Sequence, residues 1–237
     1  MSGLASRTQR QIPMDLPHRA GMTRADFIVG AANAQAIALV DSWPAWSSPV
    51  ALVAGPVGSG KTHLANIWRA QTGGTILRAA SLRDADVPAV VGSGAVAVED
   101  LHAGPLDEAA LFHLLNLAVE RKAPLLMTSR VWASALPVRL PDLRSRLQAA
   151  RPVELGEPDD ELLRRVLVKL FADRQLAVDS GVVDYIALRM ERSLEGANVI
   201  VADLDREALA AATPVTKRLA GLSLARIFDH QPDLFGE

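Results

Sequence analysis

Cysteine is absent from the 237-residue sequence, and aromatic residues are scarce, at 4% with a single tyrosine. The absence of cysteine excludes disulfide bonds, thiolate metal sites and a cysteine nucleophile. Because so few aromatic residues are available, we expect the hydrophobic core to consist mainly of alanine, leucine and valine. The length suffices for one large domain, or for a main domain with a small additional one.

An excess of charge of either sign is also missing. The 25 lysine and arginine residues oppose 27 aspartate and glutamate residues, which gives a net charge of −2. This balance argues against a protein that functions mainly by direct contact with DNA, since such proteins carry a concentrated positive surface. The apolar runs are too short to span a membrane, and prolines rather than an apolar segment follow the basic N-terminal stretch. We therefore expect a cytoplasmic protein without a signal peptide or a membrane partner.

Short aliphatic segments recur along the first two thirds of the chain, separated by stretches long enough for helices. Five of these segments have the length of strands: Val50–Val53, Thr75–Leu77, Ala95–Glu99, Pro124–Thr128 and Pro152–Leu155. The alternation of strands and helices predicts an α/β fold in which helices cover both faces of a five-stranded parallel sheet.

After residue 158 the strand pattern ends and helical spacing takes over. The acidic residues Asp159–Glu161 suit a helix N-terminus, and apolar residues then recur every three to four positions. Further helices are predicted from about Asp179, over Glu195–Ala211, and after Thr213–Pro214, where the threonine would be the N-cap and the proline the first helical residue. The expected organisation is an extended arm (1–22), an α/β body (23–157), a small all-helical domain (158–225) and a tail (226–237).

The clearest motif occupies residues 55 to 62. Its residues Gly55, Pro56, Val57, Gly58, Ser59, Gly60, Lys61 and Thr62 fit the phosphate-binding pattern G-x-x-x-x-G-K-[ST] in full, after a predicted strand and before a predicted helix. The glycines allow backbone N–H groups to surround phosphate oxygens, Lys61 would bind the outer phosphates, and the Thr62 hydroxyl would bind Mg²⁺. The motif predicts nucleotide binding; a glycine-rich turn followed by a chance Lys-Thr pair is the alternative.

Two acids stand at the end of the third predicted strand. Glu99 stands where a P-loop protein places the acid associated with Mg²⁺, and Asp100 stands where an acid would orient the attacking water. Aspartate is usual at the first of these positions, so the glutamate displaces both functions by about one methylene, and positioning matters greatly in such sites. We infer weak intrinsic hydrolysis. Alternatively, both acids only cap the strand.

Residues 23 to 222 resemble the AAA+ ATPases of the DnaA and Hda group. The resemblance rests on Gly60–Leu64 at the end of the P-loop, on Asp26–Gly30 with Asn33, and on Arg192–Ala197. It implies an AAA+ body with a helical lid domain and a bound ADP or ATP with Mg²⁺. The segment before the first strand would lie over the adenine, and the implied contacts outside the P-loop are Phe27, Val29, Gly30, Asn33 and His63.

The same resemblance implies roles for four polar residues near the phosphates. Thr128 and Ser129 would form the first sensor of the γ-phosphate, and Arg192 would be the second sensor, reaching from the lid. Arg146, within Leu140–Leu147, would be an arginine finger acting in trans, because a guanidinium suits the charge of the transition state. Considered without the family, Thr128 and Ser129 would form a simple turn and Arg146 would be a surface arginine.

Two terminal peptides resemble segments that bind the sliding clamp of DNA polymerase. The first resembles the N-terminal docking peptide of Hda proteins, with Met14 in place of the more usual leucine, and its contacts would be Gln11, Ile12, Met14 and Leu16. The contacts of the second would be Gln231, Asp233, Leu234 and Phe235. A flexible segment of this kind can place an apolar pair in a groove while the glutamine amide hydrogen-bonds at its rim. Packing of either tail against the body is the alternative.

The resemblance favours a regulator of replication initiation. Such a protein would dock on the clamp and stimulate the hydrolysis of DnaA-bound ATP, which prevents re-initiation, and it would reach DNA only through the clamp. We expect no helix-turn-helix domain of the kind that DnaA initiators carry. An autonomous ATPase, acting as a helicase loader or in dependence on single-stranded DNA, is the main alternative, and an adaptor with a purely structural nucleotide is another. A homo-oligomer is also compatible with the sequence.

Overall fold

The computed structural model describes residues 22–229, so both predicted clamp-binding peptides, 11–16 and 231–235, lie outside the described residues. One parallel sheet has the strand order β2-β3-β4-β1-β5. Its strands are β1 (Val50–Ala54), β2 (Thr75–Arg78), β3 (Val96–Glu99), β4 (Leu125–Ser129) and β5 (Arg151–Glu154). The five predicted strands are confirmed, and no boundary moves by more than one residue.

Helices cover both faces of this sheet. They are α1 (Ala34–Asp41), α2 (Lys61–Thr72), α3 (Val87–Gly92), α4 (Glu108–Glu120) and α5 (Pro141–Ala149), with short 3₁₀ turns at Ala79–Asp84 and Ala133–Ala135. Successive residues of β1 point to opposite faces: Val50 and Leu52 join a core with α3, α4 and α5, whereas Ala51 and Val53 join a second core with α1 and α2. Leucine, valine and alanine dominate both cores, as the composition predicts.

Three of the tryptophans gather at one place beside the sheet. Trp68 of α2 is fully buried, and the ring of Trp46 stacks on it with centroids 4.4 Å apart. Trp43 meets both rings edge-on. Much of the small aromatic content of the chain therefore serves to pack the segment after α1 against α2.

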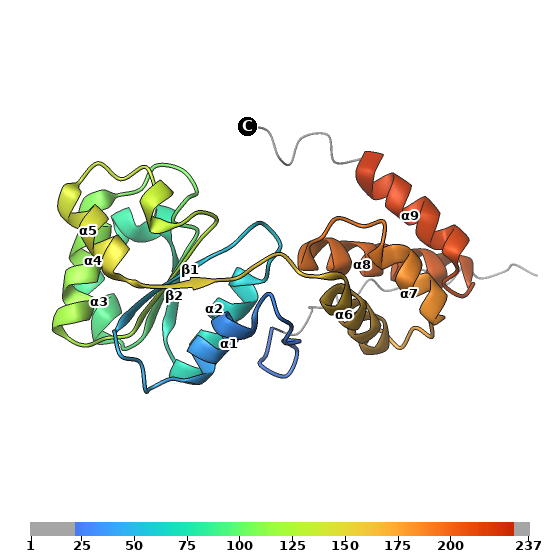
Figure 1. Cartoon of the computed structure of the whole chain (residues 1–237), viewed down its shortest axis with the longest axis horizontal. Coiled ribbons are helices and arrows are strands. Elements are labelled where there is room, and N and C mark those ends of the chain that lie inside the picture. The colour runs from blue at the N-terminus through green and yellow to red at the C-terminus, as the bar shows by residue number, and fades with distance from the viewer. Residues whose placement is uncertain (1–21, 230–237) are drawn as a thin grey trace, which may run out of the picture.

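The remaining helices form a separate bundle. They are α6 (Asp160–Asp173), α7 (Ser180–Ala187), α8 (Leu194–Ala211) and α9 (Lys217–Asp229), and they share a core of their own. Figure 1 shows the sheet with its helices on one side of the molecule and this bundle on the other, joined through the segment that follows β5. We refer to residues 22–157 as the body and to the bundle as the lid.

Side-chain caps fix the starts of three lid helices. Asp159, Asp179 and Ser193 each accept a backbone N–H of the first turn of α6, α7 and α8, which satisfies donors that a helix start leaves without a partner.

The predicted start of the last helix was wrong. The helix begins at Lys217, because the hydroxyl of Thr216 accepts the N–H of Leu219 and the carbonyl of Thr216 accepts the N–H of Ala220. Neither Thr213 nor Pro214 belongs to it, since the buried Val215 holds the chain against the lid core just before the cap.

Between residues 22 and 229, no helix is both long enough and apolar enough to cross a membrane.

Candidate functional site

The P-loop, the acidic pair and the Thr-Ser pair meet at one edge of the sheet. The P-loop follows β1, Asp100 follows β3, and Ser129 ends β4. Because β4 lies between β1 and β3 in a parallel sheet, the carboxyl ends of these strands are neighbours. Open α/β sheets bind their ligands outside this edge.

The first P-loop glycine is held against two strands. The N–H of Gly55 donates to the carbonyl of Ser129 (3.1 Å), and a Cβ at Gly55 would lie 2.1 Å from the carbonyl oxygen of Leu155. Backbone does not yield to such a contact, so only glycine fits there. Further along the loop, Gly58 and Gly60 adopt positive φ (68° and 103°), and Gly60 is the N-cap of α2. This conformation is one that glycine adopts without a steric penalty.

Lys61 lies folded against the loop itself. Its Nζ donates to the carbonyls of Gly55 (2.7 Å) and Pro56 (2.5 Å) and lies 3.5 Å from the hydroxyl of Ser59. Burial, together with the positive charge of Arg130, lowers the pKa of Lys61 to about 8, and the carboxylates of Asp100 and Glu99 oppose this shift. The ammonium group thus sits beside a second cation in a partly desolvated place, which an anionic ligand would stabilise.

Asp100 has an unusual backbone that the predicted first sensor supports. Its φ is +63°, a region that aspartate tolerates better than most residues. The buried Thr128 accepts the N–H of Asp100 through its hydroxyl (3.3 Å) and the N–H of Leu101 through its carbonyl (3.0 Å). The hydroxyl of Ser129 accepts the N–H of Val131 (3.2 Å). In this structure Thr128 therefore supports the backbone beside the acidic pair, whereas the Ser129 hydroxyl supports the turn after β4.

A cavity of about 680 Å³ opens between this edge of the sheet and the lid. Nine residues predicted from the sequence line it, namely Phe27, Asn33, Val57, Gly58, Gly60, Lys61, Thr62, His63 and Asp100. The other predicted residues inside the described part of the chain lie outside its lining, namely Val29, Gly30, Gly55, Pro56, Ser59, Glu99, Thr128, Ser129, Arg146 and Arg192.

The segment predicted to lie over an adenine does form one wall of the cavity. Phe27 is buried, and its ring meets the imidazole of His63 edge-on at 5.1 Å. Asn33 is buried too, but its side chain braces the backbone, because Oδ1 accepts the N–H of Gly30 (2.8 Å) and Nδ2 donates to the carbonyl of Ile28 (3.0 Å). Phe27 is thus the side chain with which this segment forms the cavity wall, and Asn33 shapes the turn that holds Phe27 in place.

Neither predicted catalytic arginine faces the cavity. Arg146 is exposed on α5, with its guanidinium carbon 5.5 Å from the centre of the Phe112 ring. Arg192 pairs with Asp160 of α6 (2.8 Å) and leaves 59% of its side chain exposed. The structure therefore does not bring Arg192 to the phosphate loop, and both arginine roles stay predictions.

Several charged residues of the cavity wall were not predicted. Arg130 directly follows the Thr-Ser pair, and its N–H donates to His102 Nδ1 (3.1 Å). Burial lowers the pKa of His102, and the charge of Arg130 adds to this effect. Arg130 directly follows β4, and this place in the sequence could have indicated that it belongs to the site. No comparable signal marked the lid residues Lys169, Asp173 and Arg174, which look like ordinary polar positions of an amphipathic helix.

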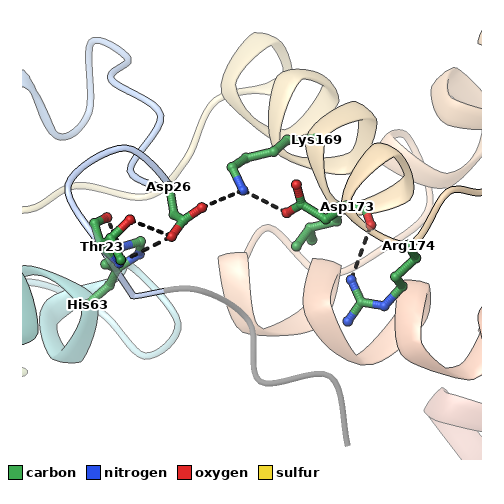
Figure 2. A network of polar contacts seen from close by, with 7 residues as sticks. Thr23, Asp26, His63, Lys169, Asp173 and Arg174 are labelled. Carbon is green, nitrogen blue, oxygen red and sulfur yellow. Dashed lines mark hydrogen bonds and ion pairs between the residues drawn. The ribbon is translucent and has the colours of Figure 1, made fainter. Parts of the chain in front are cut away.

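Figure 2 shows how these lid residues meet the body. Lys169 Nζ lies between two carboxylates, 2.8 Å from Asp26 and 2.6 Å from Asp173 one turn along α6. Asp26 also accepts the hydroxyl (2.6 Å) and the N–H (3.2 Å) of Thr23, and the carbonyl of Thr23 lies 2.9 Å from His63 Nε2. The network therefore extends from the lid to the helix that begins at the P-loop.

The electrostatic consequences fit this geometry. The hydrogen bond from Lys169 lowers the pKa of Asp26 to about 2, with help from Thr23. Burial opposes the charged form of Lys169, but the hydrogen bonds to Asp173 and Asp26 outweigh it and raise the pKa. Burial lowers the pKa of His63, which favours its neutral imidazole.

A magnesium ion that arrives with phosphates fits the donors of the site. Mg²⁺ keeps several waters and is bound by one or two carboxylates plus substrate phosphates. Thr62 and Asp100 both line the cavity, whereas the predicted ligand Glu99 is buried beside it. Residues 22–229 hold no group of three or more histidine or acidic side chains that would bind a metal alone.

The sequence matches no protein family model and no curated protein. The structure is similar to domain III of the replication initiation protein DnaA from Thermotoga maritima (TM-score 0.71, 18% identity, 86% of this chain and 96% of that one). It is also similar to AMPPCP-bound DnaA from Aquifex aeolicus (0.65, 17%, 86% and 68%) and to the Holliday junction branch migration motor RuvB from T. maritima (0.61, 17%, 75% and 61%). These similarities show that the chain shares the fold of these proteins.

Proposed function

We propose that this protein binds ADP or ATP with Mg²⁺ in the cavity between body and lid. The observation that carries the proposal is the complete P-loop, Gly55–Thr62, opening into a cavity whose opposite wall is the lid. A volume of about 680 Å³ lies within the range of small-molecule sites. The AMPPCP named for the A. aeolicus DnaA structure is a bound nucleotide analogue on a similar fold, and this supports the proposal.

The residues at the phosphate end suggest how the chain would hold the ligand. Helix α2 begins at the P-loop, so its first N–H groups and its dipole would favour phosphate oxygens. Lys61 would exchange its contacts with the loop carbonyls for the outer phosphates. Thr62 would hold the ion and Asp100 would orient the attacking water, and bound Mg²⁺ would neutralise charge on the phosphates. Phe27 and the apolar residues of α6 would enclose the base.

We further propose that the protein regulates replication initiation by acting on DnaA. It would dock on the sliding clamp through Gln11–Leu16 or Gln231–Phe235 and supply Arg146 to the nucleotide site of a neighbouring DnaA molecule. Arg146 is exposed and does not line the chain's own cavity, which is compatible with action in trans. The similarity of the fold to domain III of a replication initiation protein supports a role in replication initiation.

The nucleotide proposal is tested by titration calorimetry with ADP and ATP. Lys61→Ala should abolish binding, whereas Arg164→Ala, which breaks an exposed ion pair with Asp184 outside the cavity, should not. Equal binding by the Lys61 variant and the wild type would refute the site.

The regulatory proposal needs a second assay, the hydrolysis of DnaA-bound ATP with the clamp loaded on DNA. Arg146→Ala should abolish the stimulation and leave ADP affinity unchanged, while Gln148→Ala, also exposed on α5, should retain both. A pull-down on the clamp with Gln11→Ala and Phe235→Ala identifies the docking peptide. Rapid ATP turnover without clamp or DnaA, increased by single-stranded DNA, would instead support an autonomous ATPase or helicase loader.

A further inference from the structure

The cavity has two chemically different ends. The P-loop end carries Lys61, Thr62 and Arg130, which suit phosphates. The other end lies under α6, whose residues Val166 and Leu170 form an apolar wall. A ligand with phosphates at the first end must therefore place its nucleoside against α6.

One face of α6 makes this wall. Val166, Lys169, Leu170 and Asp173 all line the cavity, and their spacing of three and four residues places them on the same side of a helix. Lys169 lies between the apolar residues Val166 and Leu170 on this helix. A movement of α6 at Lys169 would therefore also move the apolar wall.

The ion pair of Lys169 with Asp26 links this face to the body across 143 positions of sequence. Both side chains are only 24% exposed, and Asp26 is oriented beforehand by two hydrogen bonds from Thr23. An isolated exposed ion pair contributes little because ordering two mobile side chains offsets the attraction. Here the carboxylate is already fixed, and Asp173 holds the ammonium group from the second side.

Two other polar contacts join the body and the lid. The N–H of Leu194 donates to the carbonyl of Gly58 at the phosphate end (2.8 Å), and Arg165 donates to the carbonyl of Val29 (3.0 Å). Neither of these two contacts joins two charged side chains, whereas Lys169 and Asp26 are both charged and both line the cavity.

We propose that Lys169 is a positioning residue of the nucleotide site, which clasps α6 to the body through Asp26 and thereby sets how long a nucleoside phosphate stays bound. This inference rests on the proposed nucleotide site. Lys169 acts through the wall it positions, and its role concerns the nucleoside end of the ligand, not the phosphate end.

The test compares a fluorescently labelled ATP with inorganic tripolyphosphate, which has no nucleoside. In Lys169→Ala, the labelled nucleotide should dissociate about three to ten times faster, the range expected for a partly buried ion-pair network. The affinity for tripolyphosphate should not change, because Lys61 and α2 are intact. Lys169→Arg should restore most of the slow dissociation, since it retains the charge and the reach.

Two further variants show whether the ion pair itself is responsible. Asp26→Asn should accelerate dissociation to a similar extent, and the double variant of Asp26 and Lys169 should be no worse than either single one, as coupled partners require. Arg164→Ala is the matched control on the same helix. Lys169→Met keeps the aliphatic stem, so it serves in place of Lys169→Ala if the latter does not fold by circular dichroism.

The outcomes separate this inference from the proposed function. If the wild type binds neither ATP nor tripolyphosphate, the nucleotide site itself is refuted and the clasp with it. If the wild type binds ATP but Lys169→Ala releases it at the wild-type rate, only the clasp is refuted. Additive effects of the two single variants, or an equal loss of tripolyphosphate binding, would also overturn it.

Discussion

The backbone N–H of Leu194, the first residue of α8, donates a hydrogen bond of 2.8 Å to the carbonyl of Gly58. The lid therefore contacts the phosphate loop directly. The fit is close, since a Cβ at Gly58 would lie 2.5 Å from the Cβ of Ser193. Any change in the loop must be accommodated by the start of α8.

Gly58→Ala should displace the lid and weaken nucleotide binding. The substitution adds a steric penalty of about 1–2 kcal/mol for the left-handed backbone. It also adds a contact with Ser193, which can be relieved only if the phosphate loop or the start of α8 moves. Gly73→Ala is the matched control, because Gly73 has φ +67° with no atom within 4 Å of the added Cβ. Thermal melts and ATP titrations of both variants separate the backbone penalty from the effect of the contact with Ser193. Equal behaviour of the two variants would show that the lid adapts freely.

ATP affinity should fall as the pH rises through about 8. Without ligand, burial holds the pKa of Lys61 at about 8, and bound phosphate, being anionic, would raise it. The complex then binds more protons than the free chain above this pH, so affinity decreases by at most about tenfold per pH unit. Calorimetry between pH 7 and 9.5 should record proton uptake on binding.

The control for this pH dependence is Lys61→Arg. Its guanidinium stays protonated throughout the range, so any residual binding should lose the decline above pH 8. A decline of the same slope in the arginine variant would assign the effect to another group.

Asp100→Asn should reduce intrinsic ATP hydrolysis while ATP affinity stays equal or increases. Asparagine tolerates the positive φ of Asp100, so the loop should keep its shape, and the loss of a negative charge lining the cavity removes repulsion from the phosphates. Single-turnover hydrolysis and equilibrium binding measure the two effects separately. Loss of binding together with hydrolysis would indicate that the carboxylate holds the metal and ligand.

Asp203→Ala should destabilise the lid by about 1–3 kcal/mol, the usual consequence of removing a buried hydrogen-bonding partner. Asp203 is 7% exposed and joins α8 to α9, since it accepts from the hydroxyl of Ser223 (2.5 Å) and from Arg226 (2.7 Å). Asp205→Ala is the control, because Asp205 is 38% exposed and lies 3.8 Å from Arg174. Chemical denaturation of both variants checks the difference, and equal losses would show that burial of Asp203 contributes nothing.

The sheet and the P-loop could be predicted because their signals are local. Strands buried on both faces appear as short aliphatic runs, and Gly55–Thr62 is a continuous motif with a steric reason for its glycines. The start of α9 was missed for a physical reason. Two Thr-containing stretches compete as caps within four residues, and burial of Val215 in the lid core decides between them.

The charged wall of the site was not predictable in the same way. Lys169 and Asp26 are 143 positions apart, and nothing local to either residue indicates the other. The direction of Arg192 depends likewise on Asp160 in a neighbouring helix. A motif determines the position of such a residue in the chain, whereas tertiary packing determines the direction of its side chain.

The position of β1 between β4 and β5 also constrains when the phosphate loop can form during synthesis. The P-loop is shaped by the carbonyls of Ser129 and Leu155, both far downstream. A nascent chain that has been synthesised only as far as α4 carries the whole motif but neither of the strands beside it. Such long-range pairing is slow to form. The phosphate loop should therefore acquire its shape only once β5 has left the ribosome, and a nucleotide bound there as proposed would assist the folding of the body only at that late stage.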